Sequence, residues 1–232
     1  MSIAEICSAA KSASISMAGL DTATKNQALT RIAEELKNNS DKIIAANEKD
    51  LKQAEEDSLA APLLKRLKFD ESKLASVVAG IQSLIEIEDP VGRTLAATEL
   101  DKGLELYKVS CPLGVVGVIF ESRPDALVQI STLCLKSGNA VLLKGGSEAD
   151  NTNTILAEVI CAAGSQAGLP EGWLGLLHSR GDVAEMLSMD EYIDLIIPRG
   201  SNRFVRHIMD NTNIPVLGHA DGICHVYVDG EA

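Results

Sequence analysis

The chain has 232 residues, 46% of them hydrophobic and 23% charged, which excludes a disordered or collagen-like protein and fits one large folded domain or two small ones. Its 33 acidic and 21 basic side chains give a formal net charge of −12, which disfavours nucleic acid and anionic lipid as partners because both are bound mainly through Lys and Arg. The longest apolar run, residues 113–120, is much shorter than the ~18 residues that a membrane span needs, so no membrane partner is expected.

The first ninety residues favour helices. Apolar residues recur at helical spacing over residues 3–10 and 29–36, and Asp21 is placed to cap the second of these helices. A third helix is expected to start at Ser40 and a longer one near Asp70. Charged residues gather on the opposite faces, which is typical of solvated helix surfaces, so no chemistry is assigned to them.

The pattern changes after residue 89. The segment 92–114 lacks a helical period and contains the turn signal Asp101-Lys102-Gly103. This turn separates two runs, residues 94–100 and 104–111, that are expected to pair as a β-hairpin.

From residue 115 onward, apolar strands alternate with amphipathic helices. Strands that are apolar throughout imply a parallel sheet covered by helices on both faces. The predicted fold class is therefore α/β, with N-terminal helices and a Rossmann-like sheet. The expected strands are residues 115–120, 140–143, 174–177, 193–197, 214–217 and 223–228, and the expected helices between them are residues 124–137, about 148–167 and about 201–210.

Four loops that follow the expected strands combine basic residues with glycine, in a chain that is otherwise acidic. Ligands of open α/β sheets bind at the carboxyl ends of the strands. Helix N-termini there attract anions, and glycine lets a phosphate approach the backbone. Together the loops predict a site for a phosphorylated ligand. They are residues 121–125, 144–148, 178–182 and 198–203.

The individual signals are weaker than their combination. Neither GxGxxG nor GxxxxGK[ST] occurs, and residues 144–147 alone favour an ordinary turn over a ligand site. Residues 198–201 favour neither interpretation. His207 stands among apolar neighbours on an expected helix and is interpreted as structural. Residues 219–225 contain two His, an Asp and a Cys, but their spacing fits no common zinc site, so no metal is predicted and Cys224 is interpreted as a buried core thiol.

The five cysteines are scattered, with no CxxC pair, which is typical of reduced thiols. The first residues show neither the basic segment nor the long apolar run of a secretory signal. We therefore expect a cytoplasmic location.

Four long motifs stand in the second half of the chain: VGVIFESRPD at residues 116–125, SGN at 137–139 running into LKGG at 143–146, IDLIIPRGS at 193–201, and GHADGICHVYVD at 218–229. They resemble the signature of the γ-glutamyl phosphate reductase (glutamate-5-semialdehyde dehydrogenase) family, which belongs to the aldehyde dehydrogenase superfamily. The resemblance implies NADPH-dependent reduction of γ-glutamyl phosphate to glutamate 5-semialdehyde and phosphate, a step of L-proline biosynthesis. The family's reaction proceeds through a thioester on a catalytic cysteine.

The resemblance also implies which residues hold the cofactor. One loop would contact the adenosine ribose and its phosphate, and another would face the pyrophosphate. The first group is Lys144, Gly145 and Ser147, and the second is Arg199, Gly200 and Ser201. The Arg123–Asp125 turn would lie near the substrate end, with Asp125 as a substrate-end contact; many family members have Asn at this place, so no oxyanion-binding role is assigned to Asp125.

The family's catalytic cysteine lies in an Arg-Pro-x-x-Cys-Asn motif beyond the segment 218–229, and none of the five cysteines here matches it. Residues 216–220 also lack the glutamate base of hydrolytic aldehyde dehydrogenases, as a phosphorylating enzyme should. We therefore expect an N-terminal portion with an incomplete cofactor domain, no catalytic residue and no turnover by itself.

Within this portion we expect a helical part at residues 1–91, an oligomerisation-type hairpin at 92–114 and a Rossmann-like NADP-binding core at 115–232, without the catalytic domain. The full-length protein is expected to form a homo-oligomer, and the truncated sheet to expose apolar surface and self-associate. Two alternatives remain open: a non-catalytic nucleotide-binding or regulatory fragment, and another acylating aldehyde dehydrogenase.

Overall fold

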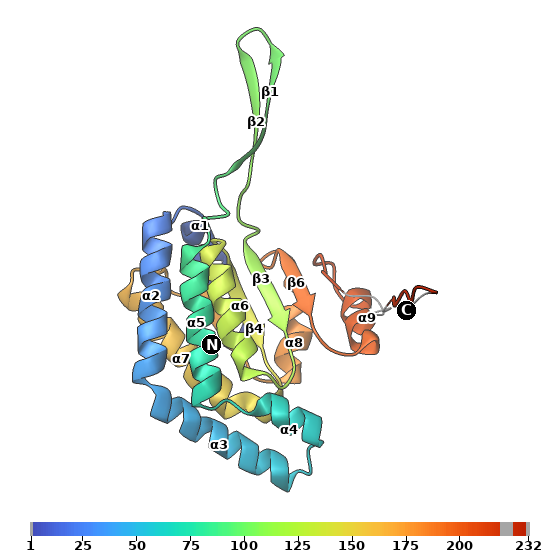
Figure 1. The fold of residues 1–232 in the computed structure, drawn as a ribbon. Helices are drawn as coiled ribbons and strands as arrows, with labels where there is room; N and C mark the ends of the chain where they lie inside the picture. The colour runs from blue at the N-terminus through green and yellow to red at the C-terminus, as the bar shows by residue number, and fades with distance from the viewer. Residues whose placement is uncertain (1, 219–224, 231–232) are drawn as a thin grey trace.

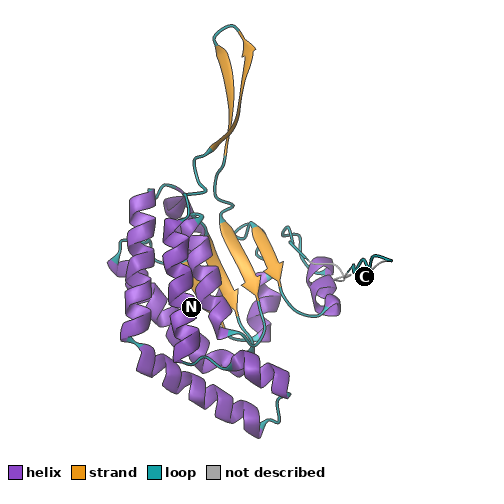
Figure 2. Cartoon of the chain, viewed as in Figure 1, coloured by secondary structure: helices purple, strands orange, loops and turns teal. Residues whose placement is uncertain are grey.

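The computed structural model describes residues 2–218 and 225–230. They form a four-stranded parallel sheet with helices on both faces, and a separate two-stranded hairpin (Figures 1 and 2). The predicted α/β class is confirmed. The helices are α1 (Ile3–Ala18), α2 (Thr22–Asn38), α3 (Ser40–Glu56), α4 (Ala61–Leu67), α5 (Glu71–Glu86), α6 (Pro124–Lys136), α7 (Asp150–Gln166), α8 (Arg180–Met186) and α9 (Asn202–Asp210), with a 3-10 turn η1 (Ser147–Ala149) before α7. The strands are β1 (Thr94–Asp101), β2 (Leu104–Val109), β3 (Val115–Ile119), β4 (Ala140–Lys144), β5 (Leu174–Leu177) and β6 (Leu195–Pro198).

The parallel sheet has the strand order β5-β4-β3-β6. Val116 of β3 pairs with Val141 of β4 on one side and with Leu195 of β6 on the other. Every residue of β3 and β4 is buried, which explains why both strands are apolar without alternation. The chain order reverses beside β3, because β4 and β5 follow on one side and β6 joins on the other.

Two apolar clusters cover the two faces of the sheet. Val116 and Val118 belong to the larger cluster, together with buried residues of α2, α5, α6 and α7. Val115 and Ile119 point to the opposite face and belong to a second cluster with residues of α1 and α8. The helices of the first ninety residues therefore complete the core of the sheet.

Most helix boundaries follow the predicted signals. Asp21 accepts a hydrogen bond from the Thr24 amide at 2.8 Å and is an N-cap as expected. Asp70 accepts one from the Lys73 amide at 3.0 Å and caps α5, which starts where a helix was expected. Gly138, at φ 72°, follows α6 in the left-handed conformation that glycine adopts most readily. Helix α7 begins at Asp150 rather than near residue 148, after the short turn η1.

The last expected strands are only partly confirmed. Strand β6 starts at Leu195 rather than at residue 193, because the Ile193 amide donates to Met189 O in the preceding turn. Residues 214–217 form one isolated parallel bridge, between Ile196 and Val216, rather than a strand.

The expected strand at residues 223–228 is wrong where it can be compared with the structure. Residues 225–228 are exposed and outside any strand, since no described strand pairs with them. Residues 223 and 224, and with them the predicted buried thiol of Cys224, lie outside the described residues.

Two short helices, α4 and α8, were not predicted. Helix α8 begins with a capping box, in which Asp182 N donates to Ser179 Oγ and the Asp182 carboxylate accepts from Ser179 N.

Within the part of the chain that the structure describes, no helix is long and apolar enough to span a membrane.

The predicted hairpin is present, with β1 antiparallel to β2 and Thr98 opposite Leu106. All residues of both strands are exposed. Figure 1 shows the hairpin projecting from the body at the end opposite to that where β3 and β6 finish.

Candidate functional site

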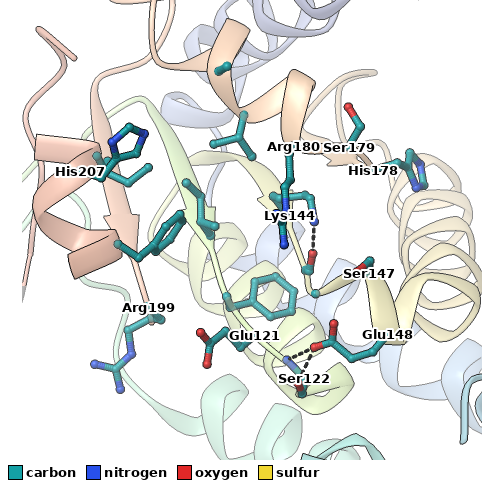
Figure 3. Close-up of a pocket in the computed structure, with 18 of the residues that line it drawn as sticks. Glu121, Ser122, Lys144, Ser147, Glu148, His178, Ser179, Arg180, Arg199 and His207 are labelled. Atoms are coloured by element: carbon teal, nitrogen blue, oxygen red, sulfur yellow. Dashed lines mark hydrogen bonds between the residues drawn. The ribbon is translucent and has the colours of Figure 1, made fainter. Parts of the chain in front are cut away.

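A cleft of about 1040 Å³ lies at the carboxyl ends of the parallel strands. All four loops that the sequence predicted as a ligand site contribute to its walls (Figure 3). They supply Ser122 after β3, Lys144 at the end of β4, Arg180 after β5 and Arg199 after β6. The predicted convergence of these loops is confirmed.

The sheet topology explains why the cleft forms here. The chain crosses over in opposite directions on the two sides of β3, so the loops after β3 and β6 separate and leave a crevice. The Arg199 amide donates to Ile119 O at 2.7 Å, which fixes the exit of β6 beside that of β3. The exposed side chain of Arg199 lines this end of the cleft.

Lys144 occupies the other side of the cleft at the end of β4. The residue is 8% exposed, and its Nζ donates to the Gly145 carbonyl oxygen. Burial lowers the pKa of Lys144, while the charges of Glu148 and Asp150 oppose this shift. The ammonium group is thus held in the cleft wall, with a neutral carbonyl as its hydrogen-bond acceptor.

Gly145 and Ser147 continue the cleft wall after Lys144. A Cβ atom on Gly145 would lie 2.2 Å from Nδ2 of Asn153, whose residue is only 2% exposed. Only glycine therefore lets this loop pack against α7. Ser147 is exposed at the start of η1, so its hydroxyl is accessible from the cleft.

Gly200 and Ser201 lie in the loop between β6 and α9, next to Arg199 but not among the residues that line the cleft. Ser201 Oγ accepts a hydrogen bond from the Phe204 amide at 3.3 Å and caps α9. The two predicted cofactor loops therefore differ: residues 144–147 line the cleft directly, whereas residues 200–201 stand at its edge.

The cleft also has apolar walls, supplied by α8 and α9. Val183 comes from α8 and Leu187 directly follows it, and Phe204 and Ile208 come from α9. His207 is exposed on α9 and lines the same cleft, so it does not stand among buried apolar side chains, as its interpretation as a structural residue assumed. Val205 and Ile208 form the buried side of α9, which leaves His207 on the accessible side.

Sequence reasoning missed further residues of the cleft. Leu59, which precedes α4, and Leu63, which lies in it, line the cleft although no sequence pattern pointed to them.

A hydrogen-bonded contact joins two of the predicted loops. Glu148 accepts hydrogen bonds from the Ser122 amide, at 2.9 Å, and from the Ser122 hydroxyl, and so ties the loop after β4 to the loop after β3 (Figure 3).

Asp125 lies outside the cleft, in the first turn of α6. Its residue is 4% exposed, and Oδ2 accepts from Arg123 at 3.0 Å and lies 3.5 Å from Lys73 Nζ. The carboxylate is thus engaged by two cations at a helix N-terminus, where negative charge is stabilising.

No group of three or more His, Cys, Asp or Glu side chains within the described residues is arranged to hold a metal ion.

Residues 1–217 match the aldehyde dehydrogenase family. The gamma-glutamyl phosphate reductase of Pelotomaculum thermopropionicum is 65% identical over 232 residues, which are 100% of this chain and 54% of that protein. The chain thus spans about half the length of the curated relatives it matches.

Two solved structures share the fold of this chain, which again covers about half of each. The gamma-glutamyl phosphate reductase of Thermotoga maritima has a TM-score of 0.90 at 32% identity, covering 94% of this chain and 53% of that one. The enzyme of the same name from Saccharomyces cerevisiae has a TM-score of 0.89 at 44% identity, covering 97% of this chain and 57% of that one.

Proposed function

The chain belongs to the aldehyde dehydrogenase family, and from this premise we propose that the cleft at the strand ends binds NADP(H). Lys144 and Ser147 would hold the adenosine ribose and its phosphate, and Gly145 would allow their close approach. Arg199, with Gly200 and Ser201 beside it, would face the pyrophosphate.

The dimensions and chemistry of the cleft fit such a ligand. Its volume of about 1040 Å³ lies just above the range of roughly 300–1,000 Å³ usual for small-molecule sites, as suits a dinucleotide. Apolar side chains such as Val183 and Phe204 offer a surface for a flat base. Cationic groups stand at both sides, with Lys144 at the end of β4 and Arg199 after β6. This combination of apolar walls with separated cations is the observation that carries the proposal.

We further propose that the whole protein reduces γ-glutamyl phosphate to glutamate 5-semialdehyde and phosphate, a step of L-proline biosynthesis in the cytoplasm. The support is the 65% identity to a protein that carries the reductase name. When bound, the nicotinamide would supply the hydride. An enzyme thiol would first displace phosphate from the acyl phosphate, forming a thioester.

The environments of the four described cysteines do not suit the reacting thiol of that reaction. Burial raises the pKa of Cys7 and Cys161 to about 11 and that of Cys134 to about 12, so these thiols are poor nucleophiles. Cys111 is exposed, but it follows the hairpin and does not line the cleft. We therefore propose that this stretch supplies the nucleotide site, and that the reacting thiol comes from outside the described residues.

The loop between β3 and α6 would lie at the substrate end of the site. Arg123 and Lys73 both pair with the Asp125 carboxylate and so fix this loop. The role proposed for Asp125 is therefore to keep this loop in place next to the substrate.

The hairpin is proposed as a contact between copies of the chain. Its exposed apolar side chains include Leu95, Leu104, Leu106 and Tyr107, each more than half exposed. An exposed two-stranded ribbon is at best marginally stable by itself, so a partner surface would stabilise it.

The nucleotide site is tested by a binding titration of the 232-residue chain, followed by NADPH and NADH fluorescence. Lys144→Ala should weaken NADPH binding more than NADH binding, because the ammonium group would contact the additional phosphate. Equal loss for both cofactors would refute that assignment. Lys65→Ala, on the exposed side of α4, is the matched control.

The substrate is tested on the full-length protein. Turnover with γ-glutamyl phosphate is expected, whereas preference for an acyl-CoA would identify a different acylating aldehyde dehydrogenase. A full-length protein that binds NADPH without reducing either substrate would favour a regulatory nucleotide-binding role.

A further inference from the structure

Two cations face each other across one end of the cleft. Lys144 ends β4, and Arg180 begins α8 directly after the loop that follows β5. Figure 3 shows the Arg180 side chain extending from the start of α8 towards the end of β4, where Lys144 lies. Burial is the main cause of the lowered pKa of Lys144, and the charge of Arg180 lowers it further, so the two cations interact unfavourably.

The acidic groups around this pair are engaged by other donors. Glu148 accepts from the amide and hydroxyl of Ser122. Asp182 accepts from the amides of His178 and Ser179, both at 2.9 Å. Asp150 lies 2.9 Å from the His178 ring nitrogen. These three carboxylates are therefore engaged by residues other than Lys144 and Arg180.

The cations themselves lack such partners. Lys144 has a neutral carbonyl as acceptor. Within residues 2–218 and 225–230, the Arg180 guanidinium takes part in no hydrogen bond or ion pair. Two like charges that repel each other, one of them buried, are both stabilised by an anion placed between them.

The position of the pair separates it from the proposed pyrophosphate contact. Arg199 follows β6, and β3 stands between β6 and β4 in the sheet. Neighbouring strands are about 4.8 Å apart, so the exits of β6 and β4 are separated by roughly 10 Å. A dinucleotide bound across this distance meets cations at two separate points. NADPH has two separate anionic groups, the pyrophosphate and the 2′-phosphate, whereas NADH has only the first.

We propose that Arg180 is a specificity-determining residue that, together with Lys144, binds the 2′-phosphate of the adenosine ribose and so makes the site selective for NADP(H) over NAD(H). This inference rests on the proposed nucleotide-binding function. A guanidinium suits the task because it can form two parallel hydrogen bonds to a phosphate monoester.

The test uses calorimetric titration of the 232-residue chain with two probes, adenosine 2′,5′-bisphosphate and adenosine 5′-monophosphate. Wild type should bind the bisphosphate more tightly. Arg180→Gln should raise the Kd for the bisphosphate by about tenfold, as expected for the loss of a charge-assisted hydrogen bond, and change the Kd for the monophosphate by less than about twofold. Arg180→Lys should recover part of the preference. Arg206→Gln, on an exposed position of α9 outside the cleft, is the matched control and should change neither Kd.

The outcomes separate the two proposals. If wild type binds both probes equally, or if Arg180→Gln weakens both to the same extent, the 2′-phosphate contact is wrong while the nucleotide site stands. If wild type binds neither probe, both the contact and the proposed function are wrong. Unchanged far-ultraviolet circular dichroism and melting temperature of Arg180→Gln would establish that the variant remains folded.

Discussion

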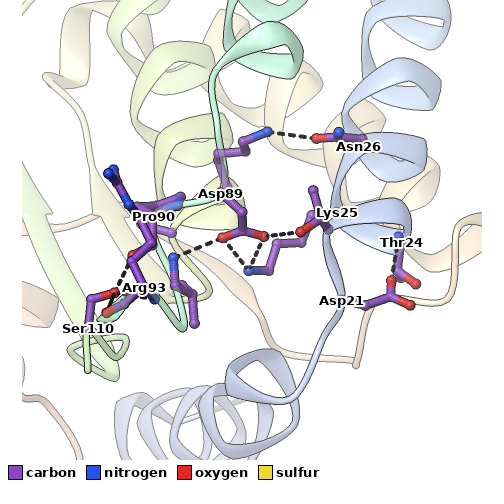
Figure 4. Close-up of polar contacts among 12 residues, drawn as sticks. Asp21, Thr24, Lys25, Asn26, Asp89, Pro90, Arg93 and Ser110 are labelled. Atoms are coloured by element: carbon purple, nitrogen blue, oxygen red, sulfur yellow. Dashed lines mark hydrogen bonds and ion pairs between the residues drawn. The ribbon is translucent and has the colours of Figure 1, made fainter. Parts of the chain in front are cut away.

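Lys25 and Asp89 form an ion pair in the interior of the protein, with Nζ of Lys25 2.9 Å from Oδ2 of Asp89 (Figure 4). The Lys25 side chain is 1% exposed. Asp89 also accepts hydrogen bonds from Thr22 Oγ1 at 2.8 Å and from the Val91 amide at 3.0 Å. The pair therefore links the start of α2 to the segment that leads into the hairpin.

Lys25→Met should lower the free energy of unfolding by about 3 kcal/mol, because it removes a buried ammonium group and leaves the Asp89 carboxylate, whose side chain is 12% exposed, without this ion-pair partner. Lys68→Met is the control, since Lys68 pairs with Asp70 at the surface, with side chains 60% and 41% exposed. Lys68→Met should cost much less stability than Lys25→Met, because solvent screens an exposed ion pair. Urea unfolding of both variants measures the difference, and equal losses would show that burial of the Lys25 pair is unimportant.

Acid should weaken the start of α8 through Asp182. Hydrogen bonds from the hydroxyl and amide of Ser179 and from the His178 amide lower the pKa of Asp182 to about 2. Because the folded-state pKa lies below the ordinary value of about 3.9, the stabilisation is complete above that pH and is lost as the pH falls towards 2.

Asp182→Asn isolates this contribution. Wild type should be more stable than the variant near neutral pH, and the gap between their melting temperatures should close as the pH falls below about 4. A gap that stays constant over this range would contradict the assigned role of the carboxylate.

Gly145→Ala should both destabilise the protein and weaken NADPH binding. The added Cβ would meet Nδ2 of the buried Asn153 at 2.2 Å, and overpacking of this kind costs about 1–3 kcal/mol. Gly181→Ala is the control, because the nearest atom to its Cβ is Ser179 Oγ at 3.4 Å and Gly181 lies within α8. Its stability should match or slightly exceed that of wild type. Chemical denaturation measures the stability of the two variants, and titration measures their NADPH affinity. Equal stability and equal affinity of Gly145→Ala and Gly181→Ala would contradict this account.

Leu106→Asp should reduce self-association. Leu106 is 56% exposed on the hairpin, where an apolar contact with a second copy would exclude a charge. Light scattering of the wild-type chain should show a species larger than a monomer, and the variant should shift towards the monomer. The control variant Lys102→Asp, in the turn between the strands, should not shift the chain towards the monomer. A monomeric wild-type chain would count against the proposed role of the hairpin.

The long elements could be predicted from sequence because their signals are local. The apolar runs at β3 and β4 and the caps Asp21 and Asp70 each depend on neighbouring residues alone. The strand expected at residues 223–228 failed over residues 225–228, because an apolar run does not reveal whether a partner strand lies beside it. Helix α8 was missed although Ser179 and Asp182 form a capping box, since seven residues give too short an apolar pattern.

The candidate site was predictable as a set of loops but not as a set of contacts. The loops after the strands could be located because parallel strands end on one side of the sheet. The arrangement of Lys144 and Arg180 on facing sides of the cleft depends on how α8 packs against the sheet, which no local sequence pattern predicts. His207 was expected among apolar side chains because its neighbours were counted without their helical phase: Val205 and Ile208 define the buried side, and His207 does not share it.

The central claim is that the cleft at the strand ends binds NADP(H), and mapping the bound cofactor by nuclear magnetic resonance tests it most directly. Titration of the ¹⁵N-labelled chain with NADP⁺ should shift the amide signals of residues 119–122, 144–148, 178–180 and 199–201, while the hairpin signals at residues 94–109 stay unchanged. Saturable shifts confined to another surface, or no shifts at millimolar cofactor, would contradict the account.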